Sequence, residues 1–234
     1  MSAPCPTFRP GPKTDSSSSC SSPVSQLWIS FRQIDAEQTI NLRKTVLWPS
    51  IPLSKQLDPS YDLRESTVHL GAFLHLRSAD DPSSLSASSS RMRIPITIKP
   101  DSTSVLHDIE EGYLDGNEPI GIMTLTQQSY SGAELALPNI GTGNCNKHIQ
   151  LRKFAILPRL QGQSIGRQFL LHAIEYIKSN YPDERILCHF DARVSQRKFY
   201  ERCGMKVLDE KSFWKFGSTG QEPGVEYIKM GNIV

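Results

Sequence analysis

The 234-residue sequence predicts one α/β domain, and the main evidence is the stretch from Leu151 to Lys178. This stretch begins with an apolar run, breaks at Pro158 and passes through a glycine-containing turn at Gln161–Gly166. It then becomes an amphipathic helix, because apolar residues recur at three- and four-residue spacing on one face. These apolar residues are Phe169, Leu170, Ala173, Ile174 and Ile177. Short alternating segments on both sides of this unit predict the remaining strands.

The turn at Gln161–Gly166 has the features of an anion-binding site. The first amides of a helix lack intrahelical partners, and the helix dipole favours negative charge there. A Walker loop is excluded because Gly162 and Gly166 are too close together and are followed by Arg167, and the G-x-G-x-x-G fingerprint is absent. An ordinary strand–turn–helix connection is the alternative for the turn taken alone.

Composition narrows the classes of protein. The formal net charge of +2 is close to neutral, which indicates neither a basic surface for nucleic acid nor a strongly acidic surface. Five cysteines without C-x-x-C spacing argue against a disulfide framework and a zinc site, so we expect no metal and a reducing compartment. No apolar run approaches the ~20 residues of a membrane helix. We expect a cytoplasmic protein, with the nucleus open, and neither nucleic acid nor membrane as partner.

Two regions differ from the rest. Residues 1–24 are rich in Ser and Pro, which predicts a disordered tail, with a transit peptide as the weaker alternative. Residues 25–234 are then a single domain. Insertions at about 77–118 and 127–147 should lie on the surface, over the active site, because loops this long are usually functional or disordered.

Strand and helix signals divide the domain further. The segment from Asp35 to Leu47 reads as a helix ended by Trp48–Pro49, and a two-turn helix with Ser195 as N-cap should close at Gly204. Pro95 cannot donate a backbone hydrogen bond, so the strand around it should lie at the edge of the sheet. Strands are predicted at 27–31, 67–74, 93–99, 119–125, 185–190, 206–213 and 225–230.

The turn resembles the acetyl-CoA loop of the GNAT N-acetyltransferases. Their pattern Q/R-x-x-G-x-G/A reads here Gln161-Gly162-Gln163-Ser164-Ile165-Gly166, with Ser164 in place of the middle glycine. The segment ARVSQRKFYERCGM resembles the second CoA-side motif of the family, F-Y-x-x-x-G-[FM], and LRKTVLWP resembles its first helix in one branch. The resemblance spans Gln26 to Met230, apart from the insertions.

The resemblance implies the GNAT fold. This is a mixed, mostly antiparallel sheet of about seven strands, splayed between its fourth and fifth strands and flanked by helices. Acetyl-CoA is the cosubstrate and lies in the splay. By position, the resemblance assigns its binding to Phe154, Ala155, Ile156, Arg159, Gln161, Gly162, Gln163, Ser164, Ile165, Gly166, Arg167, Arg193 and Lys198. For Arg193 a structural tie between strand and helix is the alternative, and for Lys198 a solvated side chain.

Tyr200 is the candidate catalytic residue. A phenol titrates near 10, so Tyr200 is protonated at neutral pH and can donate to the departing CoA thiolate. Packing beside Phe199 is the alternative. The base is not identified, because the strand predicted before the turn has Arg152 and Lys153 where members of the family often have Glu. Water, His69 or His189, or a carboxylate from an insertion are the options.

The expected function is acetyl transfer from acetyl-CoA to a primary amine of a small molecule. A non-catalytic acyl-CoA sensor or scaffold, a protein or peptide N-acetyltransferase, and an aminosugar-phosphate acetyltransferase are the alternatives. The acidic residues between Asp108 and Glu118 read as a solvated loop or as an acidic mouth that attracts a cationic amine. A homodimer through the late strands stays open.

Overall fold

The computed structural model describes residues 26–77, 94–96, 117–130, 145–216 and 224–234. The strands are β1 Gln26–Ile34, β2 Thr67–Arg77, β3 Ile94–Ile96, β4 Gly121–Gln127, β5 Lys147–Ile156, β6 Ile186–Arg193, β7 Lys206–Lys215 and β8 Val225–Ile233. The main helices are α1 Ile40–Leu42, α2 Pro59–Asp62, α4 Ile165–Asn180 and α5 Arg197–Arg202. The predicted tail and most of both predicted insertions lie outside the described residues.

The strands form one mixed sheet in the order β3-β1-β2-β4-β5-β6-β8-β7. The pair β5–β6 is parallel and all other pairs are antiparallel. The predicted α/β class and mixed sheet are confirmed, with eight strands instead of about seven. The short β3 lies at the edge beside β1, and Pro95, which cannot donate a backbone hydrogen bond, is tolerated there.

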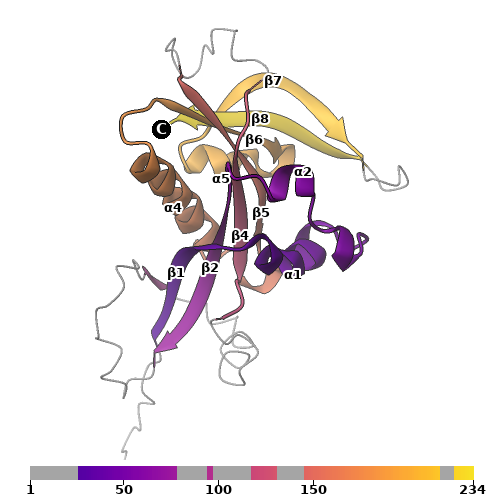
Figure 1. Cartoon of the computed structure of the whole chain (residues 1–234), viewed down its shortest axis with the longest axis vertical. Helices are drawn as coiled ribbons and strands as arrows, with labels where there is room; N and C mark the ends of the chain where they lie inside the picture. Colours follow the sequence, from indigo (N-terminus) through magenta and orange to yellow (C-terminus); the bar gives the residue numbers. More distant parts are fainter. Residues whose placement is uncertain (1–25, 78–93, 97–116, 131–144, 217–223) are drawn as a thin grey trace, which may run out of the picture.

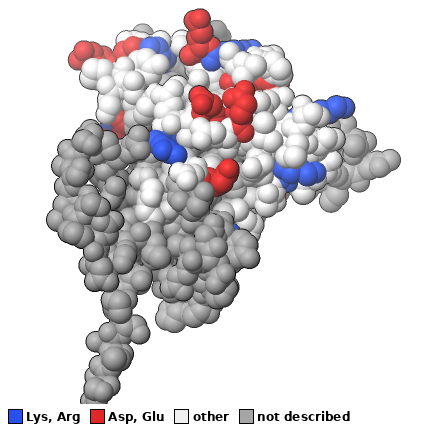
Figure 2. Space-filling model, turned by 60° about the horizontal axis from the view of Figure 1, so that its bottom comes forward, with Lys and Arg blue, Asp and Glu red and all other residues white. Residues whose placement is uncertain are grey.

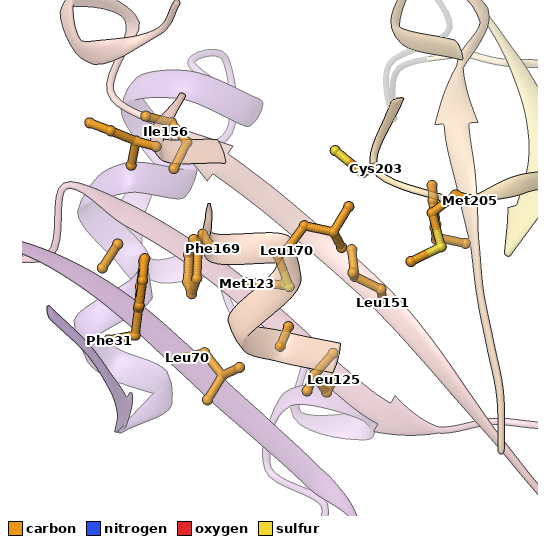
Figure 3. Close-up of a cluster of buried hydrophobic side chains, with 14 of the residues drawn as sticks. Phe31, Leu70, Met123, Leu125, Leu151, Ile156, Phe169, Leu170, Cys203 and Met205 are labelled. Carbon is orange, nitrogen blue, oxygen red and sulfur yellow. The ribbon is translucent and has the colours of Figure 1, made fainter. Parts of the chain in front are cut away.

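Helices pack on both faces of the sheet, with α4 on one side and α1 and α2 on the other (Figure 1). The core under α4 is built on aromatic and branched side chains, and the Phe169 ring stacks on Phe31 of β1 with centroids 5.2 Å apart (Figure 3). Under α1 a smaller core joins Leu42 to Phe73 and Ile122. The two cores follow from the alternation of side chains along each strand.

β5 and β6 pair over a short distance and then separate. Their register joins Lys147–Gln150 to Ile186–His189, while β5 continues to Ile156 and β6 to Arg193 without pairing to each other. In Figure 1 the β7–β8 pair beyond β6 crosses the upper part of the view at a steep angle to β5. The sheet therefore opens at this point, as the family resemblance implies.

Two helical segments, the one after Asp35 and α5, differ in detail from their predictions. The segment after Asp35 is helical to Leu47, as expected, but passes from a 3-10 turn through α1 into a π-helical turn at Arg43–Leu47. The prediction of Ser195 as a helix N-cap is wrong. A 3-10 turn at Val194–Gln196 contains Ser195, so α5 begins two residues later. Gly204 has φ +86°, as a helix-closing glycine requires.

Candidate active site

A cavity of about 1180 Å³ opens where β5 and β6 separate. Residues of both strands line it, together with the turn before α4, one side of α5, the end of the first helical segment and the late strands β7 and β8. Among the predicted site residues, Phe154, Ala155, Ile156, Gln161, Gly162, Ser164, Gly166, Arg167, Arg193 and Tyr200 line the cavity. The predicted residues Arg159, Gln163, Ile165 and Lys198 are not among its lining residues.

A β-bulge shapes the β5 wall. Ile122 of β4 pairs with Ala155, and Thr124 pairs with Arg152, so Lys153 and Phe154 together oppose Met123. Lys153 has φ +54°, in the left-handed region that a non-glycine residue rarely adopts. A bulge leaves one residue outside the ladder and turns its backbone groups. On the opposite side, β5 no longer pairs with β6 beyond Gln150, so its backbone polar groups there are outside the sheet ladder.

The turn between β5 and α4 adopts left-handed conformations at two positions. Gly162 has φ +76° and Ser164 has φ +65°. Ser164 is the N-cap of α4, but its side chain makes no capping hydrogen bond in this conformation. The side chain of Gln161 donates to the Ile156 carbonyl at 2.9 Å and ties the turn to the strand. Ile165 is buried, so only its backbone faces the turn.

Three arginines from these elements line the cavity, namely Arg167 of α4, Arg202 of α5 and Arg193 at the end of β6. Sequence analysis did not identify Arg202. It lies two residues after Tyr200 within the second motif, which is a signal that could have indicated it. An ideal Cβ at Gly166 would lie 3.5 Å from the Phe199 ring, so the first turn of α4 approaches α5 closely.

Tyr200 lies in the cavity wall with its ring packed between aromatic neighbours. Its ring centroid is 4.6 Å from that of Phe190 and 5.0 Å from that of Phe199. Burial raises the pKa of Tyr200 to about 12, and the nearby Cys203 adds to this, while Arg193 acts in the opposite direction. The phenol is therefore protonated throughout the neutral range. Burial also raises the pKa of the Cys203 thiol, while Arg167 and Arg202 act in the opposite direction.

A buried group of charges lies behind the bulge. The Arg43 guanidinium binds both carboxylate oxygens of Asp62, at 2.7 and 3.1 Å. The Lys153 ammonium binds the same two oxygens, at 2.6 and 2.7 Å. Although burial opposes it, these bonds hold the pKa of the Asp62 carboxyl well below its usual range. One carboxylate thus serves two cations, and the group keeps one excess positive charge.

A chain of hydrogen bonds fixes the tautomer of His69. Its Nε2 lies 3.0 Å from the Asp62 carbonyl oxygen, which can only accept, so Nε2 carries the proton. Its Nδ1 then accepts from the Thr124 hydroxyl at 3.0 Å, while Thr124 accepts from Arg43 at 3.3 Å. Burial lowers the pKa of His69, in agreement with a neutral ring. Both ring nitrogens are occupied by protein groups.

Sequence analysis did not identify this network, although two signals were present. Arg43 lies one helical turn from Leu47, among apolar positions, where a solvated arginine is not expected. The tract Asp58-Pro59-Ser60-Tyr61-Asp62 has the N-cap and N1 proline of a helix start, and Asp58 does cap α2 by accepting from the Ser60 amide. The pairing with Lys153 could not be read from the sequence, since 91 positions separate Lys153 from Asp62.

The acidic residues from Asp108 to Glu118 lie outside the described residues, apart from Glu118. On the face shown in Figure 2, the described Lys and Arg side chains are scattered among Asp and Glu and form no continuous basic area. Within the described ranges, no group of three or more His, Cys, Asp or Glu side chains is placed to hold a metal ion. No helix in that part of the chain is long and apolar enough to cross a membrane.

Comparison with known proteins identifies the class to which this fold and cavity belong. The model of the acetyltransferase (GNAT) family matches residues 70–205, and the chain belongs to that family. Among curated proteins, none matches the sequence.

Solved structures support the same assignment at the level of the fold. Arabidopsis thaliana NAA60 in complex with acetyl-CoA has a TM-score of 0.53 and 11% identity, over 88% of this chain and 98% of that chain. The same protein in complex with a bisubstrate analogue has a TM-score of 0.52 and 12% identity, over 88% of this chain and 99% of that chain. At these identities the likeness concerns the fold alone.

Proposed function

We propose that this protein is an acetyl-CoA-dependent N-acetyltransferase that transfers the acetyl group directly to a primary amine of a small molecule in the cytoplasm. The observation that carries the proposal is that the bulged end of β5 and the left-handed turn before α4 line the same cavity. The similar fold of NAA60, solved with acetyl-CoA, supports the same cosubstrate.

The turn suits the pyrophosphate of acetyl-CoA. The first amides of α4 lack intrahelical partners, and the helix dipole favours an anion at that end. Gly166 carries no side chain over these amides, and Arg167 and Arg202 bring positive charge from two helices. The backbone groups around Phe154 that lie outside the β5–β6 ladder suit the pantetheine amides and the thioester oxygen.

Acetyl-CoA, when bound, supplies the thioester. In the reaction a C–N bond forms to the amine and the C–S bond breaks, so the amine loses a proton and the thiolate gains one. Tyr200 is the donor closest in chemistry to this task, because it lines the cavity and stays protonated. Its high pKa makes it a hydrogen-bond donor to the thiolate more than a strong acid.

No carboxylate among the described residues that line the cavity is free to act as the base. Asp62 is shared by Arg43 and Lys153, and Asp191, the one acidic residue among the described lining residues, is bound by two lysines. His69 is occupied at both nitrogens, and His189, which lines the cavity, donates from Nε2 to the Gln128 carbonyl oxygen. We assign deprotonation of the amine to water in the cavity, because no carboxylate among the described lining residues is free.

The test is release of the CoA thiol from acetyl-CoA against a panel of polyamines, arylamines, aminosugars, free amino acids and a short peptide, with acetyl-CoA binding measured by calorimetry. Turnover with a small amine supports the proposal. Turnover with the peptide alone would make the protein a peptide N-acetyltransferase. Tight binding of acetyl-CoA without any turnover would indicate a non-catalytic sensor, and absence of binding would contradict the assignment of the turn.

A further inference from the structure

The described lining of the cavity is strongly basic. Seven basic side chains line it, and one carboxylate, that of Asp191, accompanies them. The seven are Arg152, Lys153, Arg167, Arg193, Arg202, Lys215 and Lys229. The arginines of α4 and α5 adjoin the turn assigned to the pyrophosphate. The remaining charges therefore need a separate explanation.

Lysines 215 and 229 lie on the face of the sheet opposite α5. Phe190 of β6 packs on Tyr200 of α5, and its neighbour Asp191 points to the other face, because side chains alternate along a strand. Asp191 pairs directly with Lys229 of β8 in the antiparallel register, which places both side chains on that face. Lys215 of β7 also reaches Asp191. This is the part of the cavity that remains for the amine.

Two ammonium groups share one carboxylate on this wall. Lys215 Nζ lies 2.7 Å from one oxygen of Asp191, and Lys229 Nζ lies 3.3 Å from the other. The lysines also lie over aromatic rings, Lys215 at 4.8 Å from the Tyr227 centroid and Lys229 at 5.6 Å from that of Tyr130. The rings fix their positions but supply no full negative charge. One positive charge remains in excess.

A second group of lining residues, on β5, repeats this imbalance. Lys153, which lines the cavity, shares Asp62 with Arg43, so that group also keeps one positive charge. Arg152, over the Tyr61 ring at 4.3 Å, adds a further charge to the same group. A polycationic amine entering a cavity lined by these two positive groups would be repelled, whereas an anionic group would be attracted.

We propose that the acceptor is an amine that also carries a carboxylate, which binds between Lys215 and Lys229, an inference that rests on the proposed function. The class comprises free amino acids and peptides with an acidic residue beside the N-terminal amine. The same positive charges lower the pKa of the acceptor ammonium, because nearby cations disfavour its charged form. This reduces the need for a protein base, and it accounts for a site in which no carboxylate among the described lining residues is free.

Matched acceptors test the class. Each of two sets contains an amino acid, its amide and the decarboxylated amine. The sets are phenylalanine, phenylalaninamide and phenethylamine, and leucine, leucinamide and 3-methylbutylamine. Spermidine represents polycations. We expect kcat/KM to be at least about tenfold higher for the carboxylate member of a set than for the decarboxylated amine, and the ratio to fall as salt rises. The dipeptide amides Asp-Phe-NH2 and Asn-Phe-NH2 distinguish a free amino acid from an acidic peptide as the source of the carboxylate. Preference for Asp-Phe-NH2, without turnover of free amino acids, assigns the carboxylate to a peptide.

A charge series tests the location. Asp191→Asn adds one positive charge to this wall, Lys215→Gln removes one, and Lys215→Gln with Lys229→Gln removes two. We expect the carboxylate-to-amine ratio of kcat/KM to shift by about three- to tenfold per charge, upward for the first variant and downward for the others. Lys178→Gln, at the exposed end of α4, is the control with the same charge change and should leave the ratio unchanged. Unaltered acetyl-CoA affinity and unfolding midpoints verify that each variant is folded.

The outcomes separate the two claims. Equal or better turnover of phenethylamine, 3-methylbutylamine or spermidine overturns the carboxylate inference and leaves the acetyltransferase proposal standing. A ratio that does not respond to the charge series overturns the assignment to Lys215 and Lys229. Acetyl-CoA binding without turnover of any amine overturns the proposed function, and the inference with it.

Discussion

The ammonium of Lys153 lies 2.6 Å from Oδ2 of Asp62, and this pair joins the bulge of β5 to α2. Both side chains are almost fully buried, and Arg43 binds the same carboxylate from the π-helical turn. The wall that faces the proposed amine site and the backbone that faces the proposed thioester site are thus held by one carboxylate. A change at Asp62 should affect both.

Loss of Asp62 should destabilise the fold strongly. Asp62→Asn leaves two buried cations without a counter-charge, and we expect a loss of about 3–5 kcal/mol in the free energy of unfolding, measured by urea denaturation. Lys153→Met should cost less, because the pair of Arg43 with Asp62 remains. Glu201→Gln, which breaks an exposed pair with Arg197, is the control and should cost less than about 0.5 kcal/mol. A stability near wild type for Asp62→Asn would contradict the network.

The left-handed residues of the turn should respond in opposite directions. Ser164→Gly removes the side-chain strain at φ +65°, and we expect a gain of up to about 1 kcal/mol in stability, since the strain slightly exceeds the entropy cost of glycine. Gly162→Ala should lose about 1 kcal/mol at φ +76°, although an added Cβ would meet no atom within 4 Å. Thermal unfolding of both variants measures the difference. A neutral Gly162→Ala would show that the turn relaxes.

The hydroxyl of Tyr200 should be required for turnover and not for binding. Tyr200→Phe keeps the ring between Phe190 and Phe199, and we expect kcat to fall by roughly ten- to a thousandfold with the acetyl-CoA Kd unchanged. Tyr227→Phe, on β8 in the same cavity, is the matched control. If only the Tyr227 variant lost kcat, the proton donor would be Tyr227.

Stability should fall as the pH drops from 7 to 5. Burial lowers the pKa of His69, His172 and His189, so the unfolded chain, with histidine pKa values near 6.5, binds protons that the folded chain excludes. The free energy of unfolding should decrease by up to about 1.4 kcal/mol per pH unit for each histidine within this window. The ring of His172 stacks on Phe31. His172→Gln should remove the contribution of this histidine to the pH dependence of the free energy of unfolding, measured by urea denaturation. A flat profile would show that these rings bind protons equally in the folded and unfolded chain.

The sequence predicted the class of the fold because the order of its elements is encoded locally. Alternation in β1 and β2, the apolar face of α4 and the glycine at 204 each depend on neighbouring residues. The edge position of β3 followed from Pro95 alone. Local signals failed where tertiary geometry decides, as at Ser195, which lies in a 3-10 turn that carries the chain from β6 into α5.

The candidate site was predictable on the cosubstrate side and not on the acceptor side. The turn residues 161–167 are contiguous, so one motif indicates them together. In contrast, the acceptor wall combines Asp191, Lys215 and Lys229 from three strands, and their meeting depends on the register of β6 and β8. A pattern along the chain carries no information about that register. The excess charge of the wall therefore became visible only in the folded arrangement.

The most direct test of the account is a calorimetric titration of acetyl-CoA into the wild-type protein and into Gly166→Asp. The new carboxylate would lie in the first turn of α4, where a negative charge stabilises a helix but repels a pyrophosphate. An added Cβ fits there, since its nearest neighbour lies at 3.5 Å. We expect salt-dependent binding to the wild type, and at least about tenfold weaker binding to the variant at unchanged or higher thermal stability. Equal affinity in the two proteins would contradict the assignment of this turn to the pyrophosphate.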